Sequence, residues 1–161
     1  MKEKERVVLL GLILKRISDF NINTFEGRLI LQKSIYLLQS LGLYLGYKFS
    51  WYIHGPYSPD LTRNAFALQP IYDNVPTVKF SDAKIEHEIE KFEKFVGKQR
   101  NDGDWLEQLA CAHFLKALDP KADRESIVKA VLYHEHHFRR KDCEEAWDYL
   151  RQQKLLEKEQ S

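Results

Sequence analysis

The segment FSWYIHGPYSPDL, residues 49–61, places a strand, a turn and a helix start directly after one another. Residues 47–53 alternate between apolar and polar side chains, which is the period of a strand with one buried face. Gly55 and Pro56 are turn-forming residues, so we expect the strand to end there. Ser58 is a preferred N-cap residue and begins a predicted helix. The chain therefore changes from strand to helix at this point, and the rest of the fold is expected to surround it.

Helices account for most of the remaining chain. Thr24 and Ser81 are predicted N-caps, and Asp142 with Glu145 forms a predicted capping box. A second strand is predicted at residues 77–80, paired with the first. Apolar residues recur at helical spacing over 5–19, 25–43, 59–68, 82–99, 105–118, 124–137 and 142–155.

These elements predict a mainly α fold, a multi-helix domain with a small two-stranded β element. The 161 residues suit one domain. Within it we expect a helical core with the small sheet over residues 1–100 and a three-helix part over 104–155. The helices of that second part have the spacing of a winged-helix unit. The polar tail over 156–161 is expected to fray.

The composition is that of an ordinary folded domain. The net charge is +1, with 43% hydrophobic and 30% charged residues. This balance excludes a disordered chain, and the lack of a basic excess weakens a nucleic-acid function. Cys111 and Cys143 form neither a CxxC pair nor a disulfide framework, so we expect free thiols in the cytoplasm. The uncharged run over residues 7–14 is too short to span a bilayer, and neither a membrane partner nor a signal peptide is predicted.

The histidine cluster YHEHHF, residues 133–138, is the first candidate for metal chemistry. It differs from HExxH, in which two histidines lie four residues apart on one helix face. On a helix His134 is predicted to face the core beside His137, whereas His136 points the other way. We therefore predict one buried, hydrogen-bonded histidine, two surface histidines, and no metal or other cofactor. G-x-S-x-G and phosphate-binding glycine motifs are also missing, so the sequence predicts a protein that is not an enzyme.

The C-terminal segment favours DNA binding as an alternative. Its last helix carries basic side chains before and along it, as in a winged-helix-type transcriptional regulator. Acidic residues such as Glu144 and Glu145 share the segment and would repel a phosphate backbone. The residues expected to contact phosphates are Arg139, Arg140, Lys141, Arg151 and Lys154.

Two motifs follow one another within residues 28–66. The first is the helix pattern L-Q-K-x-x-Y-L at 31–37, and the second is W-x-x-x-G-P-x-x-x-x-L at 51–61. In both, this stretch resembles the Panacea domain, also called the SocA-like antitoxin domain, and more closely the YwgA-like proteins. The resemblance implies a compact helical domain that binds and neutralises a toxin protein. The expected partner is thus a toxin encoded nearby, while DNA and a second copy of the chain stay open.

The second predicted helix has a mixed face that carries Gln32, Lys33 and Tyr36. We expect this face to form a protein-interaction surface together with His54 and Tyr57, because aromatic side chains dominate binding hot spots. Under this hypothesis alanine at Tyr57 or Lys33 abolishes partner capture and leaves the melting temperature nearly unchanged.

The same region also has an architectural interpretation. Gln32 and Lys33 would then hydrogen-bond the backbone of the strand and turn, and Trp51 would belong to the core. The sequence leaves both interpretations open for these side chains. The residues assigned a structural part in the motif are Trp51, Gly55, Pro56 and Ser58.

Overall fold

Seven α-helices and one short β-hairpin make up the computed structural model, which describes residues 2–156. The structure is 68% helical, and the predicted mainly α class with a two-stranded sheet is confirmed. The helices are α1 (Glu3–Ile17), α2 (Phe25–Leu41), α3 (Pro59–Leu68), α4 (Ala83–Val96), α5 (Gly103–Leu118), α6 (Arg124–His134) and α7 (Arg140–Gln152). The strands are β1 (Ser50–Tyr52) and β2 (Gly55–Tyr57), and the 3-10 helices are η1 (Gln69–Asn74) and η2 (Gly97–Gln99).

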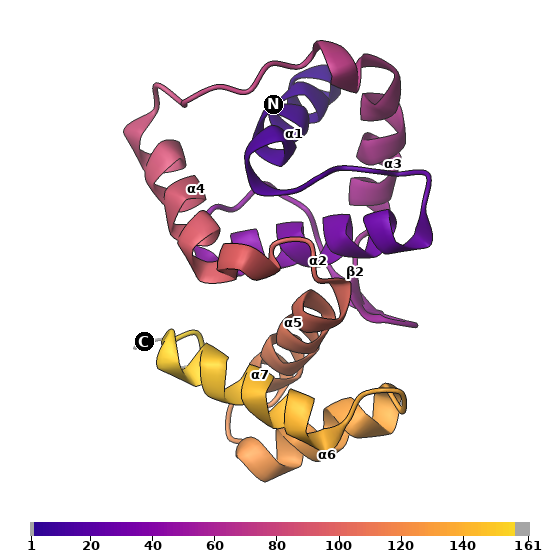
Figure 1. The fold of residues 1–161 in the computed structure, drawn as a ribbon, viewed down its shortest axis with the longest axis vertical. Helices are drawn as coiled ribbons and strands as arrows, with labels where there is room; N and C mark the ends of the chain where they lie inside the picture. The colour runs from indigo at the N-terminus through magenta and orange to yellow at the C-terminus, as the bar shows by residue number, and fades with distance from the viewer. Residues whose placement is uncertain (1, 157–161) are drawn as a thin grey trace.

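The helices form two groups that meet where α2 packs against α5. In one group α1 and α2 each contact α3 and α4, and in the other α5, α6 and α7 pack against one another (Figure 1). One hydrophobic core runs through both groups, with Leu31 and Ile35 of α2 and Leu106 and Leu109 of α5 buried in it. No strand follows α7 within the described residues, so no wing completes the C-terminal trio there. None of the described helices is long and apolar enough to cross a membrane.

Local sequence sets several helix starts. The side chains of Thr24 and Ser58 accept hydrogen bonds from backbone N–H groups three residues further on, so both predicted N-caps are confirmed. The predicted cap at Ser81 is wrong. Asp82 caps α4 instead, because its carboxylate accepts from two backbone N–H groups of the first turn.

The connection between α6 and α7 differs from the prediction at both ends. α6 ends at His134, and α7 begins at Arg140, ahead of the predicted start. Asp142 forms no capping box, and its carboxylate instead accepts two hydrogen bonds from the Arg139 guanidinium, at 3.0 and 3.1 Å. Arg139 itself is the N-cap residue and makes no side-chain cap bond.

The β-hairpin places Gly55 and Pro56 in a strand, so the turn predicted at these residues is wrong. The chain reverses at residues 53–54 instead. Gly55 has a φ of +93°, a conformation that glycine adopts without the strain a Cβ would cause, and the second strand can begin there. In the antiparallel register Ser50 lies opposite Tyr57, Trp51 opposite Pro56 and Tyr52 opposite Gly55.

Residues 77–80 do not form the predicted second strand. Side chains from two helices bind their backbone. Arg16 of α1 donates to the carbonyl of Val78 at 3.0 Å, and a carboxylate oxygen of Glu86 on α4 accepts from the N–H of Phe80 at 2.8 Å. These bonds satisfy backbone groups that a strand would offer to its neighbour.

The ion pair between α1 and α4 gives the fold a predicted sensitivity to acid. Arg16 donates to both carboxylate oxygens of Glu86, at 2.7 and 2.8 Å, and these bonds hold the pKa of Glu86 at about 2 instead of 4.5. Because the pKa of Glu86 is lower in the folded chain than in the unfolded chain, the ion pair stabilises the fold fully above pH 4.5. This contribution is lost as the pH falls through about 2. Glu86→Gln should therefore melt several degrees below the unmodified chain at pH 7, and the difference should vanish near pH 2. Equal melting temperatures at pH 7 would contradict this.

Candidate functional site

A groove of about 370 Å³ lies between the start of α2, the hairpin and α3. The hairpin projects beside the junction of α2 with α5 (Figure 1). Gln32 and Lys33 line the groove and are almost completely buried, so they form its polar base. We call it the hairpin groove, and its apolar walls are Phe25, Leu29, Tyr52, Ile53, Tyr57 and Phe66.

The walls of the hairpin groove expose large apolar side chains. Phe25, Tyr52, Ile53 and Phe66 are each 53–65% exposed, although side chains of this kind are normally buried. Single exposed apolar residues are common on soluble proteins, but a group of them around one hollow marks a binding site. Leu118 is equally exposed at the end of α5 and lies outside the groove, so it is a useful control position.

The side-chain amide of Gln32 fixes α3 against α2. Its Nε2 donates to the carbonyl of Ser58 at 2.9 Å and to Thr62 Oγ1 at 2.8 Å, while its Oε1 accepts from the N–H of Ser58 at 2.8 Å. Thr62 in turn donates to the hydroxyl of Tyr57 at 2.9 Å. Tyr57 is thereby held in the groove wall, with its ring centroid 5.3 Å from that of Tyr52.

Lys33 anchors the hairpin to α2. Its Nζ donates to the carbonyl of Pro56 at 2.7 Å, and only 2% of the residue is exposed. Burial lowers the pKa of Lys33, and nearby acidic groups oppose that shift. The prediction that Gln32 and Lys33 hydrogen-bond the strand and turn backbone is thus confirmed. Both side chains are too buried to belong to the protein-interaction surface that was predicted as the alternative.

Tyr36 is also part of the interior. Its hydroxyl lies 2.7 Å from Nδ1 of His113, which joins α2 to α5. Burial raises the pKa of Tyr36 and lowers the pKa of His113 to about 4, so both groups are neutral near pH 7. Tyr36 does not line the hairpin groove, and its predicted place on an interaction surface is wrong.

The remaining residues of the opening segment divide between groove and scaffold. The His54 side chain is 39% exposed, lines the groove and packs edge-on against Phe25 with ring centroids 5.1 Å apart. Trp51 is half-buried, and its ring lies 4.8 Å from that of His134. Pro56 and Ser58 are buried, in keeping with their predicted structural part.

The histidine cluster after α6 differs from its prediction. His134, the last residue of α6, is exposed. His136 and His137 are exposed as well, so none of the three is the predicted buried histidine. The buried members of the segment are Glu135 and Phe138, which are 3% and 7% exposed.

Two buried carboxyl groups meet beside the hairpin turn. Glu107 of α5 is 2% exposed, and its Oε2 lies 4.0 Å from Nδ1 of His54. Burial and the neighbouring charge of Glu135 together raise the pKa of Glu107 to about 8, and the charge of Lys33 opposes both effects. Burial also raises the pKa of Cys111, one turn along α5, so its thiol stays protonated and is a poor nucleophile.

Neither carboxyl group was found from the sequence. Glu107 lies in α5 next to Leu106 and one turn before Cys111. A charged residue within such an apolar stretch is a weak signal for a buried ionisable group. Nothing in the sequence pattern marked Glu135 as buried, because the helix predicted over residues 124–137 continued past it. Phe25 and Phe66 were likewise not predicted to line a groove, since their helical spacing does not distinguish them from core residues.

Comparison with known proteins adds no further assignment. No protein-family model, curated protein or solved structure matches the chain. The resemblance of residues 28–66 to the Panacea domain and the YwgA-like proteins therefore stays a prediction.

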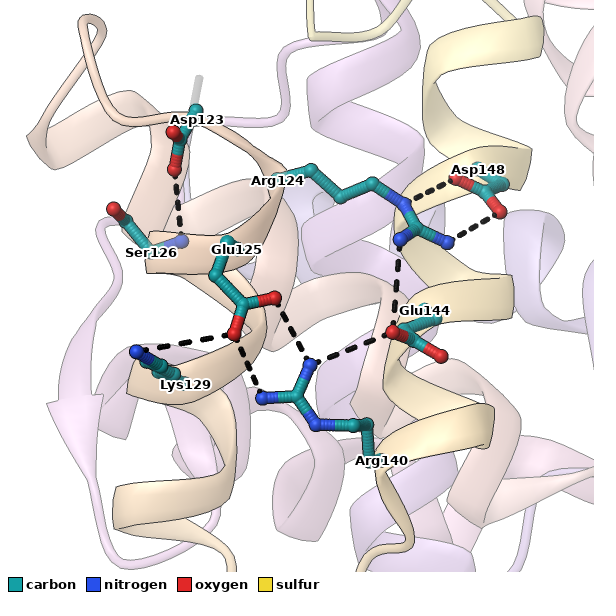
Figure 2. Close-up of polar contacts among 8 residues, drawn as sticks. All are labelled: Asp123, Arg124, Glu125, Ser126, Lys129, Arg140, Glu144 and Asp148. Atoms are coloured by element: carbon teal, nitrogen blue, oxygen red, sulfur yellow. Dashed lines mark hydrogen bonds and ion pairs between the residues drawn. The ribbon is translucent and has the colours of Figure 1, made fainter.

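Ion pairs join α6 to α7 and involve part of the basic surface. Arg124 donates to Asp148 in two bonds of 2.9 Å, and Arg140 donates to Glu125 at 2.9 and 3.0 Å (Figure 2). A phosphate would have to compete with the carboxylates that already hold these guanidinium groups. Of the predicted phosphate contacts, Arg139 and Arg140 are paired in this way, whereas Lys141, Arg151 and Lys154 are exposed and form no ion pair with another described residue.

Proposed function

We propose that the chain is a non-enzymatic protein-interaction module whose hairpin groove receives an apolar segment of a partner protein. The observation that carries this proposal is the ring of exposed apolar side chains around a hollow with a rigid, hydrogen-bonded base. A preformed groove favours binding because little conformational entropy is lost when the partner docks. The proposed setting is the cytoplasm.

The partner we propose is a toxin encoded nearby, as the resemblance to Panacea domains implies. The groove volume of about 370 Å³ suits the entry of one or two large apolar side chains of that partner. Tyr52 and Tyr57 supply adjacent aromatic rings at the wall, which is the kind of surface that dominates hot spots. A homodimer through the same groove is the competing occupant.

Co-purification tests the proposal. Tagged chain is expressed in its native cell, and captured proteins are identified by mass spectrometry, with Ile53→Asp as the groove variant and Leu118→Asp as the matched control. Both positions are exposed, at 65% and 67%, so both variants should fold. The neighbouring gene product should be captured by the unmodified chain and the control and lost from Ile53→Asp. Equal capture by all three would contradict the proposal, and recovery of a second copy alone would indicate a homodimer.

A winged-helix-type DNA-binding regulator is the second and weaker proposal. Lys141 and Arg151 on α7 and Lys154 just after it support this proposal as exposed cations. An electrophoretic shift on mixed genomic fragments at low salt tests it, because the phosphate contribution to binding is then largest. A shift that disappears in a Lys141→Gln, Arg151→Gln double variant would favour DNA, and no shift at low salt would exclude it.

A further inference from the structure

From the geometry beside the hairpin turn we infer that His54, Glu107 and Glu135 form a binding site for a divalent transition-metal cation, with Zn²⁺ preferred. Each residue places one ligand atom so that the three atoms all lie within 4.8 Å of one another. The three come from different elements: the hairpin turn, α5, and the residue that follows α6. His54 also lines the hairpin groove, whereas Glu107 and Glu135 do not, so this site borders the groove and goes beyond the proposed function.

Unpaired buried oxygens indicate that this cluster has a ligand. Oε2 of Glu107 and Oε1 of Glu135 are buried and accept no hydrogen bond from an N–H or hydroxyl group of the described residues, although the two carboxyl groups lie close enough to share a proton. The Glu107 oxygen is the same atom that lies 4.0 Å from Nδ1 of His54, so it is directed into the cluster. An unsatisfied buried polar atom costs about 1–3 kcal/mol, and more if it is charged, so such atoms call for an explanation. A bound cation would satisfy both oxygens at once.

The donor set selects the class of cation. One imidazole nitrogen and two carboxylate oxygens suit Zn²⁺ or Mn²⁺, whereas Mg²⁺ and Ca²⁺ prefer oxygen ligands alone. Three protein ligands leave a fourth position for water or another ligand. Ligand atoms around tetrahedral Zn²⁺ are about 3.4 Å apart, so the 4.0 Å separation of His54 and Glu107 has to close by roughly half an ångström, and any pair at the 4.8 Å limit by about 1.4 Å. His54 can make this movement because it lies in a partly exposed turn.

The surroundings of the cluster agree with a cation site. Nδ1 of His137 lies 3.7 Å from Oε2, the other oxygen of the Glu135 carboxylate, and can orient that carboxylate from outside. Lys33 is the neighbouring cation, but its Nζ donates to the carbonyl of Pro56. It donates no hydrogen bond to the two buried carboxylate oxygens, which stay without an N–H or hydroxyl partner among the described residues. The cation would tie the hairpin to α5 and α6 and so fix one side of the groove.

Isothermal titration of the chelator-treated full chain with ZnCl₂, and separately with MnCl₂, tests the inference. We expect one equivalent of Zn²⁺ to bind and to raise the melting temperature. His54→Ala and Glu107→Gln should each weaken binding at least about tenfold, since even residues behind the ligands change affinity by that factor. His87→Ala and Glu90→Gln, exposed positions on α4, are the matched controls and should bind as the unmodified chain does.

Two results would overturn the inference. One is the absence of stoichiometric binding of either cation to chain that is folded by circular dichroism. The other is unchanged affinity in both His54→Ala and Glu107→Gln. His54→Ala keeps the test valid if Glu107→Gln fails to fold, because the His54 side chain is 39% exposed and makes no hydrogen bond to another described residue. The groove-wall variant Phe66→Asp should bind Zn²⁺ as the unmodified chain does, because Phe66 is not a ligand. Failure of the groove proposal can therefore be distinguished from failure of the metal site.

Discussion

Lys33→Ala is expected to lower the free energy of unfolding by about 3–5 kcal/mol, because it leaves a buried hydrogen-bond acceptor unpaired and opens a cavity. The substitution removes the hydrogen bond from Nζ to the Pro56 carbonyl and leaves that buried carbonyl unpaired. It also removes a positive charge that favours ionisation of Glu107. The methylene chain of a residue that is 2% exposed would be replaced by a cavity, which adds to the loss.

Denaturant unfolding followed by circular dichroism measures this effect. Lys48→Ala is the matched control, because Lys48 precedes the same hairpin and is exposed. The control should change stability by less than about 0.5 kcal/mol. A Lys33→Ala protein as stable as the control, with partner capture lost, would return Lys33 to the interaction surface and contradict its architectural role.

Gly55→Ala is expected to destabilise the chain by roughly 3 kcal/mol or more, from two separate causes. Gly55 has a φ of +93°, which a residue with a Cβ adopts only with strain. An added Cβ would also lie 2.5 Å from Sγ of Cys111, deep against α5, where neither atom has room to move.

A double-mutant cycle separates the two causes. Cys111→Ala removes the sulfur, and the new Cβ at position 55 would then meet the Cβ of residue 111 at 3.9 Å, an ordinary contact. Gly55→Ala should therefore cost less in the Cys111→Ala background than alone, with a coupling free energy of about 1–3 kcal/mol. Additive losses would show that the hairpin does not pack on Cys111 as described.

Local sequence signals predicted the elements well where the decisive contact is also local. Thr24 and Ser58 cap their helices because a side chain reaches a backbone N–H three residues away. The strand predicted at residues 77–80 was wrong because the decisive contacts there are not local. Residues 77–80 have strand-like composition, but Arg16 and Glu86, remote in sequence, bind their backbone.

The interaction face of α2 was misjudged because α2 is a central helix. An amphipathic argument assumes that one face of a helix meets solvent. In α2 every residue from 29 to 38 is buried, since α3, α4, α5 and the hairpin all pack on it. Gln32 and Lys33 are polar because they bond the hairpin and α3, and no pattern within the helix itself distinguishes that use from surface exposure.

The affinity of the chain for the product of its neighbouring gene tests the central claim, that the hairpin groove is a protein-binding site. Isothermal titration should give measurable binding for the unmodified chain and the same affinity for Leu118→Asp. Phe66→Asp places a charge in the groove wall and should weaken binding at least about thirtyfold, the factor that corresponds to a hot-spot loss of about 2 kcal/mol. An unchanged affinity in Phe66→Asp, with the variant folded, would contradict the claim.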